Sequence, residues 1–158
     1  MGFYQNKRIG VMMSKLNILE INNRKEIIND KEVEFADLII DGISLYQRLN
    51  KYNFIPSLGW GTVEFQRDMI KYFLHEKPHE LLWYRVPVLS CPYCGDLDCG
   101  FISAKIDLLD NKVIWKDFYK GDYISDYEKK LDLGPFYFDY KSYKKTIISA
   151  LNIKNNRI

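Results

Sequence analysis

The sequence is organised around the ten residues Cys91-Pro92-Tyr93-Cys94-Gly95-Asp96-Leu97-Asp98-Cys99-Gly100. This cysteine loop holds all three cysteines of the chain, and its two glycines allow tight turns. The segment before it, Arg85 to Ser90, is largely apolar, and the segment after it, Phe101 to Asp107, alternates with the period of a strand. The pattern predicts a loop that joins two strands at one end of an antiparallel sheet.

The predicted sheet continues toward the C-terminus. Asp110-Asn111 is a turn signal between two alternating runs, the second of which is Lys112 to Phe118, and this arrangement predicts a hairpin. The residues Tyr119 to Leu133 are charged and aperiodic, so we expect a long loop that can hold a helical turn near Tyr127 to Leu131. After this loop, Phe136 to Phe138 has the residue types of a short edge strand.

Two further strands are predicted nearer the N-terminus. The first, Leu16 to Ile21, ends at the polar residues Asn22 to Lys25, and the charged residues up to Ile28 are expected to form a loop or a short helical turn. The second, Val33 to Ile40, ends at Asp41-Gly42, which is a strong turn signal.

Three helices are predicted, each after a residue whose side-chain oxygen can accept a free backbone N–H group. The capping residues are Ser44, Thr62 and Asp139. In the second and third helices apolar residues recur at spacings of three and four, which predicts one buried face on each. These residues are Phe65, Met69, Tyr72 and Phe73 in the second helix, and Tyr140, Tyr143, Ile147 and Leu151 in the third. The chain is therefore predicted to be α+β, with a mostly antiparallel sheet, a central hairpin and helices packed on one face.

A chain of 158 residues is long enough to bury a core as one domain. We place this domain at residues 14–152, with a disordered extension at 1–13 and a frayed end at 153–158. The net charge of +2 is too small to attract a nucleic acid over long range, and no apolar run reaches the ~20 residues that cross a bilayer. The N-terminus also lacks the apolar segment of a signal peptide. We therefore expect a cytoplasmic protein without a nucleic-acid or membrane partner.

The cysteine spacing favours a metal site. Cys91 and Cys94 form a Cys-x-x-Cys pair whose sulfurs can reach one ion from a tight turn, and Cys99 can supply a third ligand. Zinc in such sites takes four ligands in tetrahedral geometry, which leaves one position for another group. Two histidines are four residues apart, but a proline between them argues against a shared helix face. The candidates for the fourth position are Asp96, Asp98, His75, His79 and water.

Two other interpretations of the cysteine loop remain open. The Cys-x-x-Cys pair could act as a redox dithiol, although such sites usually begin a helix and here a strand follows. The cysteines could also be small buried residues that shape a turn, with or without a disulfide pair. In each case Asp96 and Asp98 are expected to accept backbone N–H groups within the turn.

Aromatic side chains are abundant, with twelve Tyr, nine Phe and three Trp, and such residues fill cores or anchor protein interfaces. Trp60 lies between two glycines, so we expect it on a loop, either as a binding anchor or folded back as a lid on the core. Tyr119, Tyr123 and Tyr127 belong to the predicted long loop and are further candidates for contact with a partner.

A longer pattern surrounds these residues. The cysteine loop is preceded by Pro87-Val88-Leu89-Ser90 and followed by Trp115-Lys116-Asp117-Phe118 and Gly134-Pro135-Phe136-Tyr137-Phe138-Asp139. In this pattern the chain resembles a family of small uncharacterised bacterial proteins. Its members have a Cys-Pro-x-Cys-Gly-Asp-x-x-Cys-Gly core, a Trp-x-Asp-Phe hairpin strand and a Gly-Pro-Phe-x-Phe stretch before the last helix, and some carry an oxidoreductase label. In size and aromatic content the chain is also similar to immunity proteins, which neutralise a toxin delivered by a competing bacterium.

The chain lacks a Gly-x-Ser-x-Gly nucleophile elbow and a phosphate-binding Gly-x-x-x-x-Gly-Lys loop. We therefore expect a non-catalytic protein that binds a cognate toxin directly, as the similarity to immunity proteins implies. The alternative is a zinc- or thiol-dependent, oxidoreductase-like enzyme that uses Cys91, Cys94 and Cys99. A zinc-stabilised nucleic-acid binder is a third interpretation.

Overall fold

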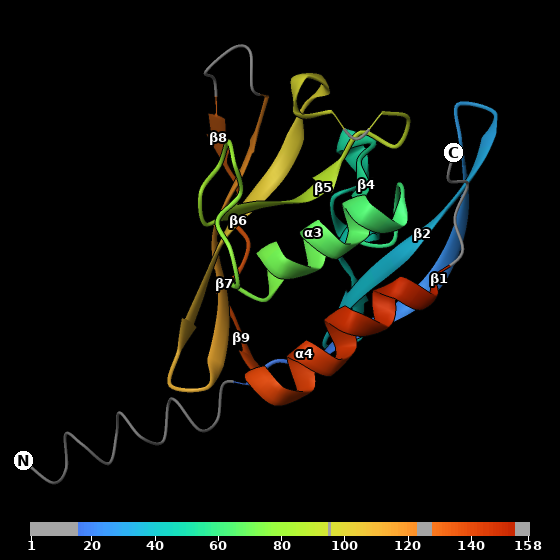
Figure 1. Cartoon of the computed structure of the whole chain (residues 1–158). Coiled ribbons are helices and arrows are strands. Elements are labelled where there is room, and N and C mark those ends of the chain that lie inside the picture. The colour runs from blue at the N-terminus through green and yellow to red at the C-terminus, as the bar shows by residue number, and fades with distance from the viewer. Residues whose placement is uncertain (1–15, 95, 123–127, 154–158) are drawn as a thin grey trace, which may run out of the picture.

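The computed structural model describes residues 16–94, 96–122 and 128–153 (Figure 1). Its helices are α2 (Leu45–Arg48), α3 (Val63–Phe73) and α4 (Tyr140–Ile148), and its 3-10 turns are η1 (Asn50–Tyr52), η2 (Leu97–Cys99) and η3 (Ser149–Asn152). Its strands are β1 (Leu19–Ile28), β2 (Lys31–Ile40), β3 (Ile43–Ser44), β4 (Ile55–Pro56), β5 (Arg85–Ser90), β6 (Phe101–Leu109), β7 (Lys112–Gly121), β8 (Glu128–Lys130) and β9 (Phe136–Asp139). The fold is α+β, as the sequence predicts.

The strands form two antiparallel sheets. The first has the order β1-β2-β3, and the second has the order β4-β5-β6-β7-β8, with β9 also paired to β7. The predicted hairpin is β6 and β7, and the cysteine loop joins β5 to β6 at one end of the second sheet (Figure 1). Both of these predictions are confirmed. The sequence patterns predict a single sheet. They do not predict the division into two sheets, because the division depends on which strands pair with one another.

The two longer helices cover the inner faces of these sheets. In Figure 1, α3 crosses in front of the second sheet, and α4 runs below it along β1 and β2. α4 contacts β1, β7, β9 and α3, so it connects the two sheets.

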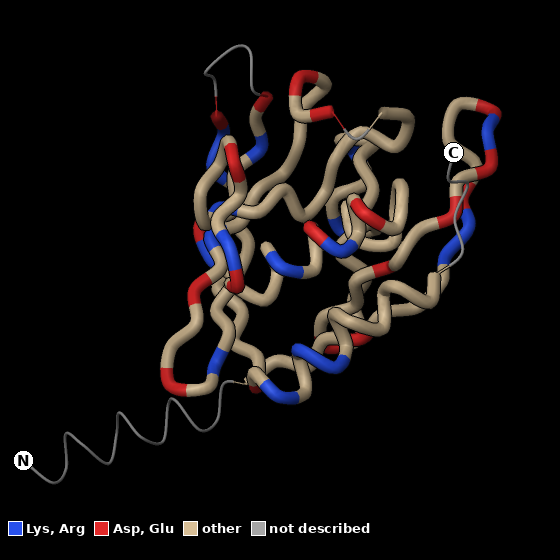
Figure 2. The backbone as a smooth tube through the Cα atoms, in the orientation of Figure 1, with Lys and Arg blue, Asp and Glu red and all other residues tan. Residues whose placement is uncertain are grey.

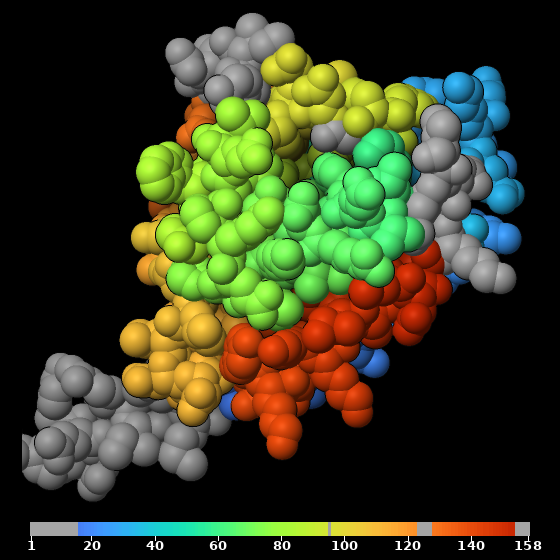
Figure 3. Space-filling model, viewed as in Figure 1, coloured from blue at the N-terminus to red at the C-terminus, as the bar shows by residue number. Residues whose placement is uncertain are grey.

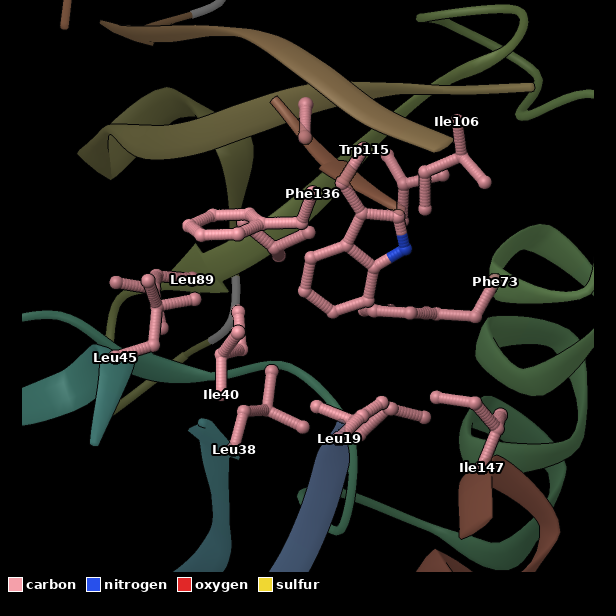
Figure 4. Close-up of a cluster of buried hydrophobic side chains, with 14 of the residues drawn as sticks. Leu19, Leu38, Ile40, Leu45, Phe73, Leu89, Ile106, Trp115, Phe136 and Ile147 are labelled. Carbon is pink, nitrogen blue, oxygen red and sulfur yellow. The ribbon is translucent and has the colours of Figure 1, made fainter. Parts of the chain in front are cut away.

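Trp115 of β7 lies within the main core (Figure 4). Its indole is fully buried and meets the rings of Phe73, Phe138 and Tyr143 at centroid distances of 5.6, 5.2 and 6.1 Å. The Trp115 Nε1 donates a hydrogen bond to the Tyr143 hydroxyl (3.0 Å), which in turn donates to the Phe73 carbonyl oxygen (2.6 Å). These bonds satisfy buried polar groups and connect β7, α4 and α3.

The predicted helix caps are confirmed. The side-chain oxygens of Ser44, Thr62 and Asp139 each accept the backbone N–H three residues later, at 3.2, 3.1 and 3.0 Å. The last helix differs from the prediction at its end. The chain tightens into η3, so Ala150 is buried instead of Leu151, which is 37 % exposed.

Two predicted loops were wrong at least in part, because residues within them form strands. β1 continues through the polar residues Asn22 to Lys25 and ends at Ile28, where a turn with positive φ at Asn29 and Asp30 leads into β2. The predicted long loop at Tyr119 to Leu133 begins inside β7, and Glu128–Lys130 form β8 rather than a helical turn. For β1 and β8 the cause is the same: each is an edge strand with mostly exposed side chains, held by backbone pairing with one neighbour, so its sequence lacks the expected alternation.

The two ends of the chain lie largely outside the described residues. The predicted extension at residues 1–13 lies outside the described residues, as does the predicted frayed end apart from Ile153. The backbone N–H of Ile153 bonds to the Ala150 carbonyl oxygen at 3.1 Å.

Among the described residues, no helix is both long and apolar enough to cross a membrane. Acidic and basic residues lie interspersed along the chain (Figure 2).

Candidate functional site

The cysteine loop bends back on itself around Asp96. The Asp96 carboxylate accepts a hydrogen bond from the backbone N–H of Asp98 at 3.0 Å. The backbone carbonyl oxygen of Asp96 accepts a second one from the backbone N–H of Cys99 at 3.2 Å. The predicted role of Asp96 as an acceptor within the turn is therefore confirmed. Gly100 ends the loop with a φ of 105°, and a Cβ at this position would lie 2.9 Å from the Phe54 ring. Gly95, also predicted to allow a tight turn, lies outside the described residues.

This turn brings the three sulfurs together. The Sγ atoms of Cys91, Cys94 and Cys99 all lie within 4.8 Å of one another, and those of Cys94 and Cys99 are 3.3 Å apart. Cys91 is partly buried, the other two are exposed, and all three are free cysteines. Three soft sulfur ligands this close could hold a metal ion.

The surroundings shift the pKa values of the Cys91 and Cys99 thiols in opposite directions. Burial raises the pKa of the Cys91 thiol, but hydrogen bonds from the backbone of Tyr93 and Cys94 and from the other thiols outweigh it, so the pKa is lowered overall. The hydrogen bond with Cys94, followed by burial, raises the pKa of the Cys99 thiol to about 12. Without a metal, Cys91 therefore loses its proton at a lower pH than Cys99.

Among the described residues, no histidine or carboxylate joins the three cysteines. Asp96 is engaged within the turn, and Asp98 lies in η2 without reaching the sulfurs. His75 and His79 follow α3, where they pack on tyrosines: His75 stacks on Tyr84 at 4.4 Å, and His79 lies 4.8 Å from Tyr72. The structure therefore does not bring any of the four predicted side chains to the sulfurs.

These histidines also belong to a motif that was not predicted. The run His75-Glu76-Lys77-Pro78-His79 matches His-Glu-x-x-His, in which a helix aims two imidazoles at one zinc ion. Here α3 ends at Phe73, and His75 has a φ of 60°, which an α-helix does not allow. The Nδ1 of His79 accepts the backbone N–H of Leu81 at 3.1 Å, and burial lowers the pKa of His79. The two imidazoles therefore pack on tyrosine rings in the loop after α3 and do not form a metal-binding pair.

Trp60 lies between β4 and α3, on the loop where it was predicted. Gly59 packs so tightly on β2 that a Cβ would lie 2.7 Å from the Cβ of Ala36. The indole meets the Phe65 ring edge to face at 5.8 Å, and its Nε1 donates a hydrogen bond to the Pro92 carbonyl oxygen at 3.1 Å. Trp60 also packs on a small apolar cluster, as the lid interpretation predicts. It therefore covers part of the core and reaches the cysteine loop.

A pocket of about 450 Å³ opens where Trp60 meets the cysteine loop. We call it the Trp60 pocket. Its walls come from the turn end of β2, from the start of α3 with the preceding loop, and from the cysteine loop, which adjoin one another in Figure 3. Its aromatic and charged lining consists of Trp60, Phe65, Tyr93, Lys31, Glu32 and Glu34. Cys94, one of the three clustered cysteines, also lines the pocket.

Tyr93 connects the cysteine loop to the β1–β2 turn. Its hydroxyl donates a hydrogen bond to the Ile28 carbonyl oxygen at 3.3 Å, and the residue is 47 % exposed. Tyr93 was not among the predicted site residues, although its place between two cysteines was a usable signal, because the tip of a tight turn projects its side chains outward. Phe65 and the turn end of β2 carried no comparable signal.

Tyr119 does not line the Trp60 pocket. It lies in β7, where the Arg85 guanidinium sits 4.8 Å from the centre of its ring. Tyr123 and Tyr127 lie outside the described residues. Of the predicted binding residues that the structure describes, Trp60 lines the pocket and Tyr119 does not.

Comparison with known proteins finds no match. No protein-family model, no curated protein and no solved structure matches the chain. The resemblance to a bacterial family therefore stays an expectation, and an assignment of function has to come from the residues of the site.

Proposed function

We propose that the chain is a non-catalytic protein-binding protein of the immunity type, which neutralises a bacterial toxin in the cytoplasm by binding it directly. The observation that supports this function is the convergence of Trp60, Phe65 and Tyr93 on one open pocket beside the cysteine loop. Trp and Tyr are enriched among the residues that carry most of the binding energy at protein interfaces, because they bury a large area at a small loss of conformational freedom.

The anchors of this pocket are held in place before a partner arrives. The Trp60 indole is bonded to Pro92, and the Tyr93 hydroxyl is bonded to Ile28. Gly59, next to Trp60, packs closely against Ala36 of β2. A pre-organised surface loses less entropy on association, which favours tight binding.

The function is tested by looking for a toxin gene next to this gene and co-expressing each such toxin with this protein. Cells that make both proteins are expected to survive, and the two chains should purify together as a stoichiometric complex. Killing that proceeds equally with and without this protein, for every neighbouring toxin, would contradict the proposal.

A second proposal concerns the cysteines, because their spacing fits a metal. We propose that Cys91, Cys94 and Cys99 bind one zinc ion. Zinc–sulfur bonds of about 2.3 Å place two sulfurs of a tetrahedral site roughly 3.8 Å apart. The observed separations, all within 4.8 Å, reach this value with shifts of about 1 Å or less. With three protein ligands the fourth position would be open, so a zinc- or thiol-dependent enzyme is the alternative function at these residues.

Zinc binding is tested by metal analysis and thiol titration of protein purified without oxygen. We expect one zinc per chain and thiols that react only after chelation. Cys91→Ser should lose the zinc, whereas the control Asp98→Asn, an exposed carboxylate of the same loop, should keep it. A metal-free protein with three reactive thiols would exclude the zinc proposal and leave the protein-binding function standing.

A further inference from the structure

We infer that the Trp60 pocket receives an arginine side chain of the partner protein. This inference rests on the proposed protein-binding function and names the group that is recognised. A volume of about 450 Å³ lies at the small end of the range for ligand pockets, which suits one long side chain and its neighbours.

The polar atoms of the aromatic wall are already engaged. The Trp60 Nε1 donates to the Pro92 carbonyl oxygen, and the Tyr93 hydroxyl donates to the Ile28 carbonyl oxygen. The rings therefore offer a ligand their π surfaces more than their hydrogen-bond donors. Such surfaces bind apolar groups, and they also attract cations through the negative face of the ring.

The charged residues of the lining favour a cation. At the turn end of β2, two carboxylates, Glu32 and Glu34, line the pocket together with one ammonium group, that of Lys31. Glu34 also accepts a hydrogen bond from the side-chain amide of Asn23, which orients the carboxylate and leaves its charge in place. Negative charge beside aromatic rings raises the local concentration of a positively charged group.

Among the cationic side chains of proteins, arginine matches this lining best. Its planar guanidinium stacks on aromatic rings, is weakly hydrated and donates hydrogen bonds to carboxylates in a fork. The chain itself contains such an arrangement elsewhere: Arg24 lies 5.3 Å from the centre of the Tyr46 ring and bonds to Glu26 and Asp37 at 2.8 and 3.0 Å. The Trp60 pocket offers the same two components, rings and carboxylates, to an arginine from outside.

The test uses the full chain and two small probes of nearly equal shape. N-acetyl-L-arginine methylamide carries a guanidinium, and N-acetyl-L-citrulline methylamide carries a neutral urea group instead. In an NMR titration of ¹⁵N-labelled protein, the arginine probe should shift the indole N–H signal of Trp60 and the backbone signals of Tyr93 and Cys94. For a single side chain we expect a Kd on the order of 10 mM, with the citrulline probe at least about fivefold weaker.

A charge-removing variant and its control sharpen the test. Glu34→Gln should weaken the arginine probe at least about threefold, whereas Glu76→Gln, an exposed carboxylate outside the pocket lining, should leave the Kd unchanged. Equal binding of the arginine and citrulline probes, or shifts that avoid Trp60 and Tyr93, would overturn the inference. Equal binding of the corresponding lysine probe would overturn the assignment to arginine.

The two proposals can fail separately. Protection against a toxin by a protein that does not bind the arginine probe would overturn the arginine inference alone. Binding of the probe at Trp60, combined with no protection against any neighbouring toxin, would overturn the proposed function and leave the pocket chemistry in place.

Discussion

The indole Nε1 of Trp60 donates a hydrogen bond to the carbonyl oxygen of Pro92, 3.1 Å away and 32 residues further along the chain. This bond ties the loop before α3 to the cysteine loop. It therefore joins the two segments with the most distinctive sequences, and residues of both segments line the Trp60 pocket.

Trp60→Phe keeps an aromatic ring and removes this bond. We expect a loss of about 1 kcal/mol in the free energy of unfolding, because the carbonyl of the buried residue Pro92 loses its donor. Urea denaturation measures the loss. The control is Trp83→Phe, since Trp83 is 72 % exposed and should change stability by less than about 0.5 kcal/mol. Equal losses in the two variants would show that the bond contributes nothing.

Gly59→Ala tests the close packing that positions Trp60. Gly59 and Gly42 both have positive φ, 77° and 82°, so alanine is strained at either site by roughly 1–2 kcal/mol. At Gly59 the new Cβ would also lie 2.7 Å from the Ala36 Cβ and 3.0 Å from its backbone nitrogen, whereas at Gly42 no atom lies within 4 Å. Urea denaturation should show Gly59→Ala to be less stable than Gly42→Ala by a further 1–3 kcal/mol, roughly. Similar stabilities would contradict the close contact between this loop and β2.

Tyr143→Phe tests the buried hydrogen bonds of the main core. The hydroxyl accepts from Trp115 and donates to the Phe73 carbonyl, so its removal leaves two buried groups without this partner. The expected loss in the free energy of unfolding is about 2 kcal/mol. Tyr140→Phe, on the same helix at a partly buried position, is the control and should cost less than about 0.5 kcal/mol. If both variants melt at the temperature of the wild type, the bonds do not stabilise the core.

Asp139 should make stability depend on pH. A hydrogen bond from the Ser142 backbone, followed by one from its hydroxyl, lowers the pKa of Asp139 below its ordinary value of 3.8. Because the folded-state pKa is the lower one, the stabilisation is present above about pH 4 and is lost as the pH falls through the folded-state pKa. The wild type should therefore exceed Asp139→Ala in Tm at neutral pH by more than it does at about pH 2. Thermal melts across this range check the prediction, which a pH-independent difference would refute.

The elements with complete local signals could be predicted from the sequence. Arg85–Ser90 and the β6–β7 hairpin show apolar or alternating patterns bounded by turn residues, and Ser44, Thr62 and Asp139 are caps whose acceptors act three residues away. The cysteine group was predictable for the same reason, because the three sulfurs lie within one short loop.

The other features of the fold and of the site depend on contacts between residues far apart in the sequence, which local sequence patterns do not reveal. β1 crosses the polar residues Asn22 to Lys25 because each pairs with a residue of β2, and the turn at Asn29-Asp30 was the one local signal for this hairpin. The approach of Trp60 to Pro92 follows from the packing of Gly59 on β2, which spacing along the chain does not reveal. Both histidines offered as zinc ligands are instead held by Tyr72 and Tyr84.

The central claim is that a protein partner binds at the Trp60 pocket, and the most direct test compares two exposed aromatic residues. Tyr93, 47 % exposed, lines the pocket, whereas Trp83, 72 % exposed, does not. Calorimetry would measure the affinity of the toxin identified by co-expression for the wild type, for Tyr93→Ala and for Trp83→Ala. We predict that Tyr93→Ala weakens binding at least about 30-fold, as expected for an interface anchor, and that Trp83→Ala leaves the Kd unchanged. Unchanged binding by Tyr93→Ala, or a loss confined to Trp83→Ala, would contradict this account.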